Sequence, residues 1–170
     1  LHTTTTCVHQ EQVQQVQDGA KLYKRINDIL ETVSEKIDGV MVSHAGNPND
    51  NCRPYSISER TYEFLKQPTY ANGAEGLNLK GTLALTDEVS MSALKSYQLT
   101  AAEKDLVGMC ATKEAKVAAL AIRAGADGII QNGRITPLVT CIADLARKDA
   151  VTRNRVHEAY RAWEQFYRRK

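Results

Sequence analysis

Apolar side chains recur at every third or fourth position between Val13 and Val40. This spacing places them along one side of an α-helix, where they form a continuous apolar stripe. The opposite side carries Gln, Lys, Asp and Glu residues, as a solvated face requires. Gly39 suits the end of such a helix because glycine adopts the left-handed conformation without strain. The pattern predicts a first helix over residues 8–41.

The apolar period is interrupted between residues 42 and 85. Two segments rich in Asn, Pro and Gly are typical of loops. Between these segments, Ser56 or Ser58 suits the N-cap of a short helix over Glu59–Lys66, with Tyr62 facing inward. We therefore expect a loop-rich insertion that contains one short extra helix.

Helical periodicity returns over residues 86–127, where Thr86 suits the N-cap and Asp87 and Glu88 suit the first turn of a helix. Thr100 followed by Glu103 has the spacing of a capping box, so this stretch is either one kinked helix or two helices. Pro137 suits the first turn of a last helix over residues 136–170, because its missing backbone N–H has no partner there in any case.

Together these segments predict an all-α fold. At 170 residues the chain is long enough for one domain with its own core. We expect a single ectodomain over residues 1–170, folded as an elongated antiparallel three-helix bundle with a loop-rich insertion and held by disulfides.

The four cysteines stand far apart in the sequence. Cys7 precedes the first predicted helix, Cys52 lies in a loop, and Cys110 and Cys141 lie in the second and third helices. In an antiparallel bundle, Cys7 would meet Cys141 and Cys52 would reach Cys110, although four cysteines allow three pairings. An even number of isolated cysteines favours disulfides, and thus an oxidising compartment, over buried free thiols.

Motifs for metal binding and catalysis were searched for and not found. His44 lies near Cys52, but no Cys-x-x-Cys or His-Glu-x-x-His spacing is present, so we predict no metal and no cofactor. A glycine-rich phosphate loop and a Gly-x-Ser-x-Gly elbow are also missing, which favours a protein that is not an enzyme. The alternative is a small secreted all-helical enzyme with its site inside the bundle, where Arg123 and Arg134 are the basic candidates.

A cysteine before a long amphipathic helix, a turn-rich excursion, an Ala-rich second helix and a long terminal helix together resemble a known family. This pattern is similar to the elongated helical bundles of trypanosome cell surfaces, which include glutamic acid/alanine-rich coat protein, haptoglobin-haemoglobin receptor and variant surface glycoproteins. The resemblance implies a coat or receptor-like protein that shields the membrane or captures a host ligand.

The resemblance also implies a location and partners. The protein would stand on the extracellular face of the plasma membrane or be secreted, and it would touch the membrane only through a C-terminal GPI anchor outside this sequence. Its expected partners are a host protein or neighbouring coat proteins. Nucleic acid is not expected, since the formal net charge is only +2.

Ligand contacts are predicted at the end of the bundle that would face away from the membrane. If an anchor follows the last helix, the connection before that helix is distal, and Ile129, Ile130 and Arg134 are its candidate contact residues. In the alternative interpretation, the two isoleucines cap the core of the bundle.

Overall fold

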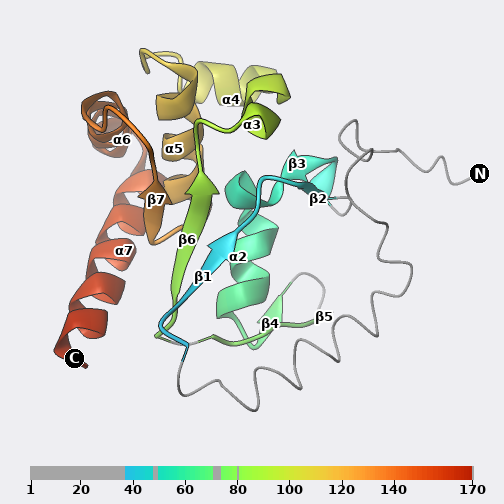
Figure 1. The fold of residues 1–170 in the computed structure, drawn as a ribbon, viewed down its shortest axis with the longest axis vertical. Helices are drawn as coiled ribbons and strands as arrows, with labels where there is room; N and C mark the ends of the chain where they lie inside the picture. The colour runs from blue at the N-terminus through green and yellow to red at the C-terminus, as the bar shows by residue number, and fades with distance from the viewer. Residues whose placement is uncertain (1–36, 48–49, 71–73, 80, 170) are drawn as a thin grey trace, which may run out of the picture.

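The structure, a computed structural model, describes residues 37–47, 50–70, 74–79 and 81–169 (Figure 1). Strands and helices are both present, and three of the strands form a parallel sheet. In chain order the elements are β1 (Gly39–Val42), β2 (Gly46–Asn47), β3 (Arg53–Pro54), the 3-10 helix η3 (Tyr55–Ile57), α2 (Glu59–Lys66), β4 (Thr69–Tyr70), β5 (Ala74–Glu75), β6 (Leu83–Glu88), α3 (Ser92–Ser96), α4 (Ala101–Leu106), α5 (Lys113–Ala124), β7 (Gly128–Ile130), α6 (Thr136–Lys148) and α7 (Ala150–Arg168).

The predicted all-α three-helix bundle is wrong. Strand β1 lies at the end of the first predicted helix, β6 spans the end of the predicted loops and the start of the second helix, and β7 lies in the predicted connection before the last helix. The predicted first helix over residues 8–41 ends in strand β1, and residues 8–36 lie outside the described part of the chain. A run of four to six apolar residues fits a buried strand as well as a helix, so periodicity alone does not separate the two.

The sheet has the order β1-β6-β7, and all of its strands are parallel. Val42 pairs with Thr86 and Val40 with Ala84, so these four side chains share one face. On that face Val42, Ala84 and Thr86 are buried. On the other face Met41 pairs with Leu85 and is 64% exposed.

Helix α5 lies at the centre of the hydrophobic core. It packs against α6, α7, α2 and η3, and it also contacts β7. Its buried residues are mostly alanines, whose small side chains let neighbouring helices approach closely. Thr112 caps its first turn by accepting a hydrogen bond from the Ala115 N–H. The alanine-rich sequence therefore belongs to a buried central helix.

Several local predictions are confirmed. Helix α2 spans Glu59–Lys66 as expected, and Tyr62 is buried. The capping box of Thr100 and Glu103 is present at the start of α4. Pro137 lies in the first turn of α6, which begins where the sequence predicts.

The two long predicted helices are interrupted. Residues 86–127 contain the end of β6, then the separate helices α3, α4 and α5. The predicted last helix over residues 136–170 breaks at Asp149, which has an extended backbone. The Asp149 carboxylate accepts hydrogen bonds from the Thr152 N–H at 2.8 Å and from the Thr152 hydroxyl at 2.6 Å, and thereby starts α7 as a new helix.

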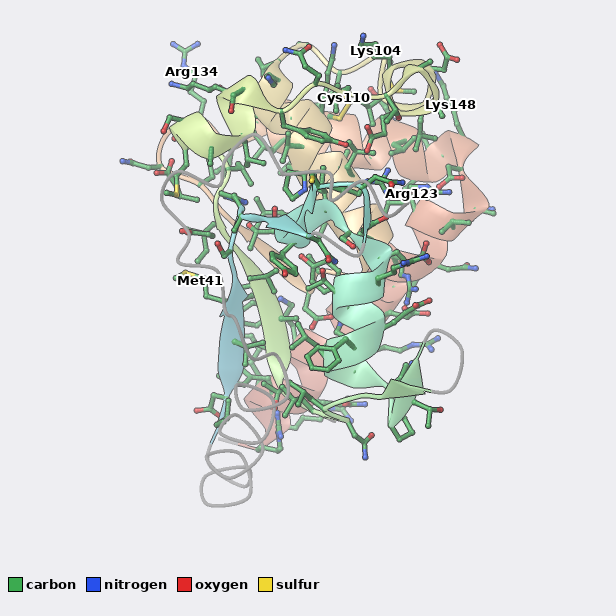
Figure 2. All side chains as sticks on the ribbon, turned by 90° about the vertical axis from the view of Figure 1, so that its right-hand side faces the viewer. Met41, Lys104, Cys110, Arg123, Arg134 and Lys148 are labelled. Atoms are coloured by element: carbon green, nitrogen blue, oxygen red, sulfur yellow. A yellow bond between two sulfur atoms is a disulfide. The ribbon has the colours of Figure 1, made fainter. Side chains whose placement is uncertain are left out.

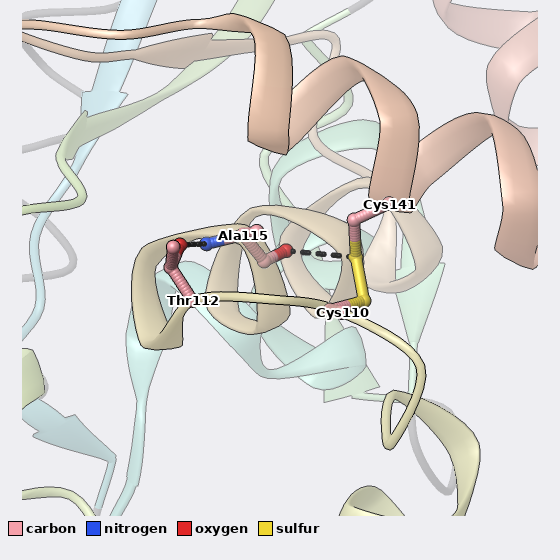
Figure 3. Close-up of a disulfide and its surroundings, with 4 residues drawn as sticks. All are labelled: Cys110, Thr112, Ala115 and Cys141. Atoms are coloured by element: carbon pink, nitrogen blue, oxygen red, sulfur yellow. Dashed lines mark hydrogen bonds between the residues drawn. A yellow bond between two sulfur atoms is a disulfide. The ribbon is translucent and has the colours of Figure 1, made fainter.

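The predicted disulfide pairing is also wrong. Cys110 is bonded to Cys141, which joins the segment before α5 to the second turn of α6 (Figure 3). Cys52 takes part in a disulfide as well, but Cys110 is not its partner. The role predicted for Cys7 falls outside the described residues. The predicted pairing required an antiparallel bundle. In this fold the start of α5 lies beside α6, which brings Cys110 to Cys141.

Candidate functional site

The carboxyl ends of β1, β6 and β7 lie at one edge of the sheet because all three strands run in the same direction. His44 follows β1, Glu88 ends β6, and Asn132 follows β7. In α/β proteins with parallel sheets, ligands bind at this edge, in loops that follow the strands. We refer to the residues at these three strand ends as the carboxyl edge.

His44 connects two parts of the carboxyl edge. Its ring is buried, with Nε2 2.8 Å from the Glu88 carbonyl oxygen and Nδ1 2.7 Å from the Ser56 hydroxyl. A carbonyl oxygen only accepts hydrogen bonds, so Nε2 carries a proton. In the neutral ring, Nδ1 then accepts from Ser56. Ser56 is fully buried, and the Ser–His pair links η3 to the end of β6.

Glu88 presents a half-buried carboxylate at the end of the central strand. Its Oε1 accepts hydrogen bonds from the Ser90 hydroxyl and, at 3.3 Å, from the Asn132 N–H. No lysine or arginine of the described residues forms an ion pair with Glu88. Its neighbour Asp87 accepts a hydrogen bond from the Glu88 N–H at 2.7 Å. Glu88 is thus oriented by neutral donors and forms no ion pair with a cation of the described residues.

Gln131 adds an unused acceptor to the same edge. Its Oε1 is buried without a hydrogen-bond partner, while its Nε2 donates to the Asn132 carbonyl oxygen at 3.2 Å. A buried acceptor without a partner costs about 1–3 kcal/mol. Native proteins rarely keep such groups except where they have a role. The half-buried Glu88 carboxylate therefore suits a ligand that brings N–H or O–H donors, whereas the Gln131 Oε1 reaches such a ligand only after its side chain turns.

Exposed apolar side chains accompany these acceptors at the end of β7 and in the segments that follow β6 and β7. Ile130 ends β7 and is 38% exposed, Met91 follows β6 and is 40% exposed, and Ile135 precedes α6 and is 62% exposed. A ligand at the carboxyl edge would therefore meet apolar surface beside the acceptors. Within the described residues no group of three or more His, Cys, Asp or Glu side chains could hold a metal ion.

The three predicted ligand contacts differ in their surroundings. Ile129 is half-buried and packs against the hydrophobic core, as the alternative interpretation expected. Ile130 and Arg134 are exposed at the carboxyl edge. Whether they bind a ligand stays a prediction.

Arg123 and Arg134, the basic candidates for a site inside a bundle, are not brought together. Arg123 lies in the last turn of α5, before β7, and its Nε is 3.2 Å from Asp149 Oδ2. Arg134 lies beyond the other end of β7, and Figure 2 shows the two well apart. They do not form one catalytic pocket.

A second polar cluster surrounds Glu103, which is 3% exposed. Its carboxylate accepts hydrogen bonds from Arg53 at 2.6 Å, from the Tyr97 hydroxyl at 2.9 Å and from the Thr100 N–H at 2.7 Å. Burial opposes ionisation of Glu103, but these bonds outweigh it and lower the pKa of the carboxyl. Burial raises the pKa of Tyr97 to about 12. Since every partner is engaged, the cluster serves to hold β3 against α4.

Sequence reasoning considered His44 only as a metal-ligand type and Glu88 only as an acid in a helical first turn. The missed signal is a pattern of short apolar runs, each followed directly by polar residues, at 39–44, 83–88 and 128–132. Parallel strands produce this pattern because their carboxyl ends carry the loops that bind ligands.

No protein-family model matches the chain, and comparisons with curated proteins and with solved structures gave no match. The resemblance to trypanosome surface proteins thus remains a prediction. Among the described helices, none is long and apolar enough to cross a membrane.

Proposed function

We propose that this chain is an extracellular, receptor-like domain that binds a small ligand at the carboxyl edge of its parallel sheet. The observation that carries the proposal is the Glu88 carboxylate, which neutral donors orient and which no cation of the described residues neutralises. The unpaired Oε1 of Gln131 supports it. A ligand with ammonium or hydroxyl groups would bind the Glu88 carboxylate directly and the Gln131 Oε1 once that side chain turns toward it.

The extracellular location is proposed from the Cys110–Cys141 bond, because disulfides persist mainly in oxidising compartments. The elongated bundle on which both the coat and the receptor interpretations depended is not the fold, so the receptor-like role is proposed from the carboxyl edge alone. Binding is favoured over catalysis because the Ser–His pair of His44 and Ser56 is buried.

The test is a thermal-shift and NMR titration of the purified chain with ammonium and polyol probes: choline, ethanolamine, spermidine, inositol and glucose. A ligand present at one hundred times its Kd stabilises the native state by about 2.7 kcal/mol, which is a readily measured shift in Tm. We expect at least one probe to bind and to perturb the amide signals of Ser90 and Asn132.

Two variants and one control assign the site. Glu88→Gln keeps the shape of the side chain but removes its charge, so it should weaken an ammonium probe about tenfold or more, the range for a lost charged hydrogen bond. Gln131→Ala removes the second acceptor and should weaken the same probe. Glu59→Gln changes an exposed glutamate at the start of α2 and should have no effect. If no probe binds, or if both site variants bind as wild type does, the proposal is wrong.

A further inference from the structure

Helix α7 carries the same two-residue sequence twice on its outer side. Tyr160-Arg161 and Tyr167-Arg168 are separated by seven residues, which is about two helical turns or 10.5 Å along the axis. Both pairs therefore lie on one side of the helix. Tyr160 is 62% exposed and Tyr167 is 68% exposed, and both arginines are exposed. We call these four residues the tyrosine-arginine face; α7 runs along one edge of the molecule (Figure 1).

The inner side of α7 holds this face in place. The Trp163 indole N–H donates to the Asp127 carbonyl oxygen at 2.7 Å, which anchors the helix beside the start of β7. Tyr167 stacks on Trp163 with ring centroids 5.9 Å apart, and the edge of Phe166 lies against it at 5.6 Å. The Tyr167 ring is thus ordered before any ligand arrives, which lowers the entropic cost of binding.

The charges around the face are mainly positive. Arg161 forms no ion pair among the described residues. Glu164 lies between the two pairs, but its contact with Arg168 is 3.7 Å long, and both side chains are largely exposed, at 41% and 80%. Exposed ion pairs of this kind contribute little to the stability of the fold, so an anionic group of a ligand can replace the Glu164 carboxylate at Arg168. Glu158 is already paired with Arg155 at 2.7 Å.

We propose that the tyrosine-arginine face binds a linear acidic polysaccharide. A polymer of sugar rings with sulfate or carboxylate groups repeats the same two chemistries along its length. Tyrosine rings offer flat apolar surfaces to the C–H faces of sugars. Guanidinium groups bind sulfate and carboxylate through paired N–H donors.

The repeat and the compartment both point to this class of partner. A motif that recurs at constant spacing along a rigid helix suits a polymer better than a compact ligand. Single-stranded nucleic acid also combines flat rings with anions. The Cys110–Cys141 disulfide favours a polymer found outside cells over a nucleic acid. The face is separate from the carboxyl edge and does not depend on the function proposed there.

The test is isothermal titration of the intact chain with heparin, repeated at several salt concentrations. We expect binding that weakens with salt, because counterions are released. Arg161→Gln with Arg168→Gln should weaken it at least tenfold. A matched control is Arg147→Gln with Lys148→Gln, which removes two exposed positive charges from the last turn of α6 and should change affinity less than twofold.

The aromatic part of the face needs its own variant. Tyr160→Ala removes an exposed ring that contacts no other aromatic ring among the described residues, so the fold should be retained. We expect a loss of about fivefold or more in heparin affinity, within the range of one stacking contact. Absence of heparin binding, an equal loss in the α6 control, or unchanged binding by the Tyr160→Ala protein would each overturn the proposal. Tighter binding of an oligothymidylate of equal charge through the same residues would assign the face to nucleic acid instead.

Discussion

Breaking the Cys110–Cys141 disulfide should cost the native state several kcal/mol without changing the fold. The sequence separation between the two cysteines is 31. For a loop of that size, the entropy lost by the cross-linked unfolded chain corresponds to about 3.7 kcal/mol at room temperature. Both side chains are buried, so replacing them with alanine leaves a small void that adds to the loss. We therefore expect Cys110→Ala with Cys141→Ala to lower the free energy of unfolding by about 3–5 kcal/mol.

The assay is urea unfolding followed by circular dichroism, with the free energy extrapolated to water. The slope against urea should rise in the variant, because its unfolded state is less compact. Cys110→Ala alone also lacks the bond and serves as the control; it should lose nearly the same free energy. A loss below about 1 kcal/mol in the double variant would refute the reasoning, since the unfolded chain would then gain little freedom when the bond is removed.

Two further predictions concern buried carboxylates. The pKa of Glu103 is lower in the folded than in the unfolded chain, so its contribution is present above the ordinary value of 4.5 and is lost as the pH falls below it. The urea midpoint should therefore fall less steeply with decreasing pH, between neutral pH and about pH 3, for Glu103→Gln than for wild type. Asp105→Asn, which changes an exposed carboxylate, is the control. Equal slopes of midpoint against pH for Glu103→Gln and wild type would contradict this prediction. Asp127 accepts hydrogen bonds from Lys66 at 2.6 Å and from the Ala84 N–H at 2.9 Å. Asp127→Asn keeps one acceptor oxygen and loses the negative charge, so it cannot serve both donors. The free energy of unfolding should fall by about 3 kcal/mol, which is the lower end of the range for breaking a buried ion pair. The lower end applies because Lys66 is partly solvated. A change under about 1 kcal/mol would mean that water replaces the lost partner.

Local signals in the sequence predict local structure well. The capping box of Thr100 and Glu103, the proline in the first turn of α6 and the boundaries of α2 depend on residues within a few positions of each other. Their free energies come from hydrogen bonds and backbone preferences that neighbouring residues decide. These local structures are therefore predicted correctly even though the predicted overall fold is wrong.

The sheet could not be predicted in the same way. Its strands are short, and β1 pairs with β6 across more than forty residues, for example Val40 with Ala84. Val40 also continues the apolar spacing of the segment before it, and Asp87 and Glu88 suit the first turn of a helix as well as the end of a strand. Only the pairing partner decides between these structures, and strand preference depends on that context.

Two of the predicted contact residues lie at the candidate site, and their role in binding stays a prediction. Ile130 and Arg134 were chosen because they were expected at the exposed end of a rod, and they lie at the carboxyl edge of a sheet instead. Both residues are exposed, as expected, but they are exposed because they lie at the end of a strand and in the segment after it, and not because they lie at the end of a helical bundle. Glu88 was not identified because its partner donor, the Asn132 N–H, is 44 positions away in the chain.

Asp127 links the two proposed binding surfaces to the core. Its carboxylate binds Lys66 of α2 and the Ala84 N–H of β6, while its carbonyl oxygen accepts from Trp163 of α7. Strand β7 begins at the next residue and leads directly to the carboxyl edge, and Trp163 supports the ring of Tyr167. Asp127→Asn changes only the carboxylate and keeps the main-chain carbonyl that holds Trp163. The variant should therefore disturb β7 and weaken binding at the carboxyl edge while heparin binding at the tyrosine-arginine face is retained, whereas Tyr160→Ala should do the reverse.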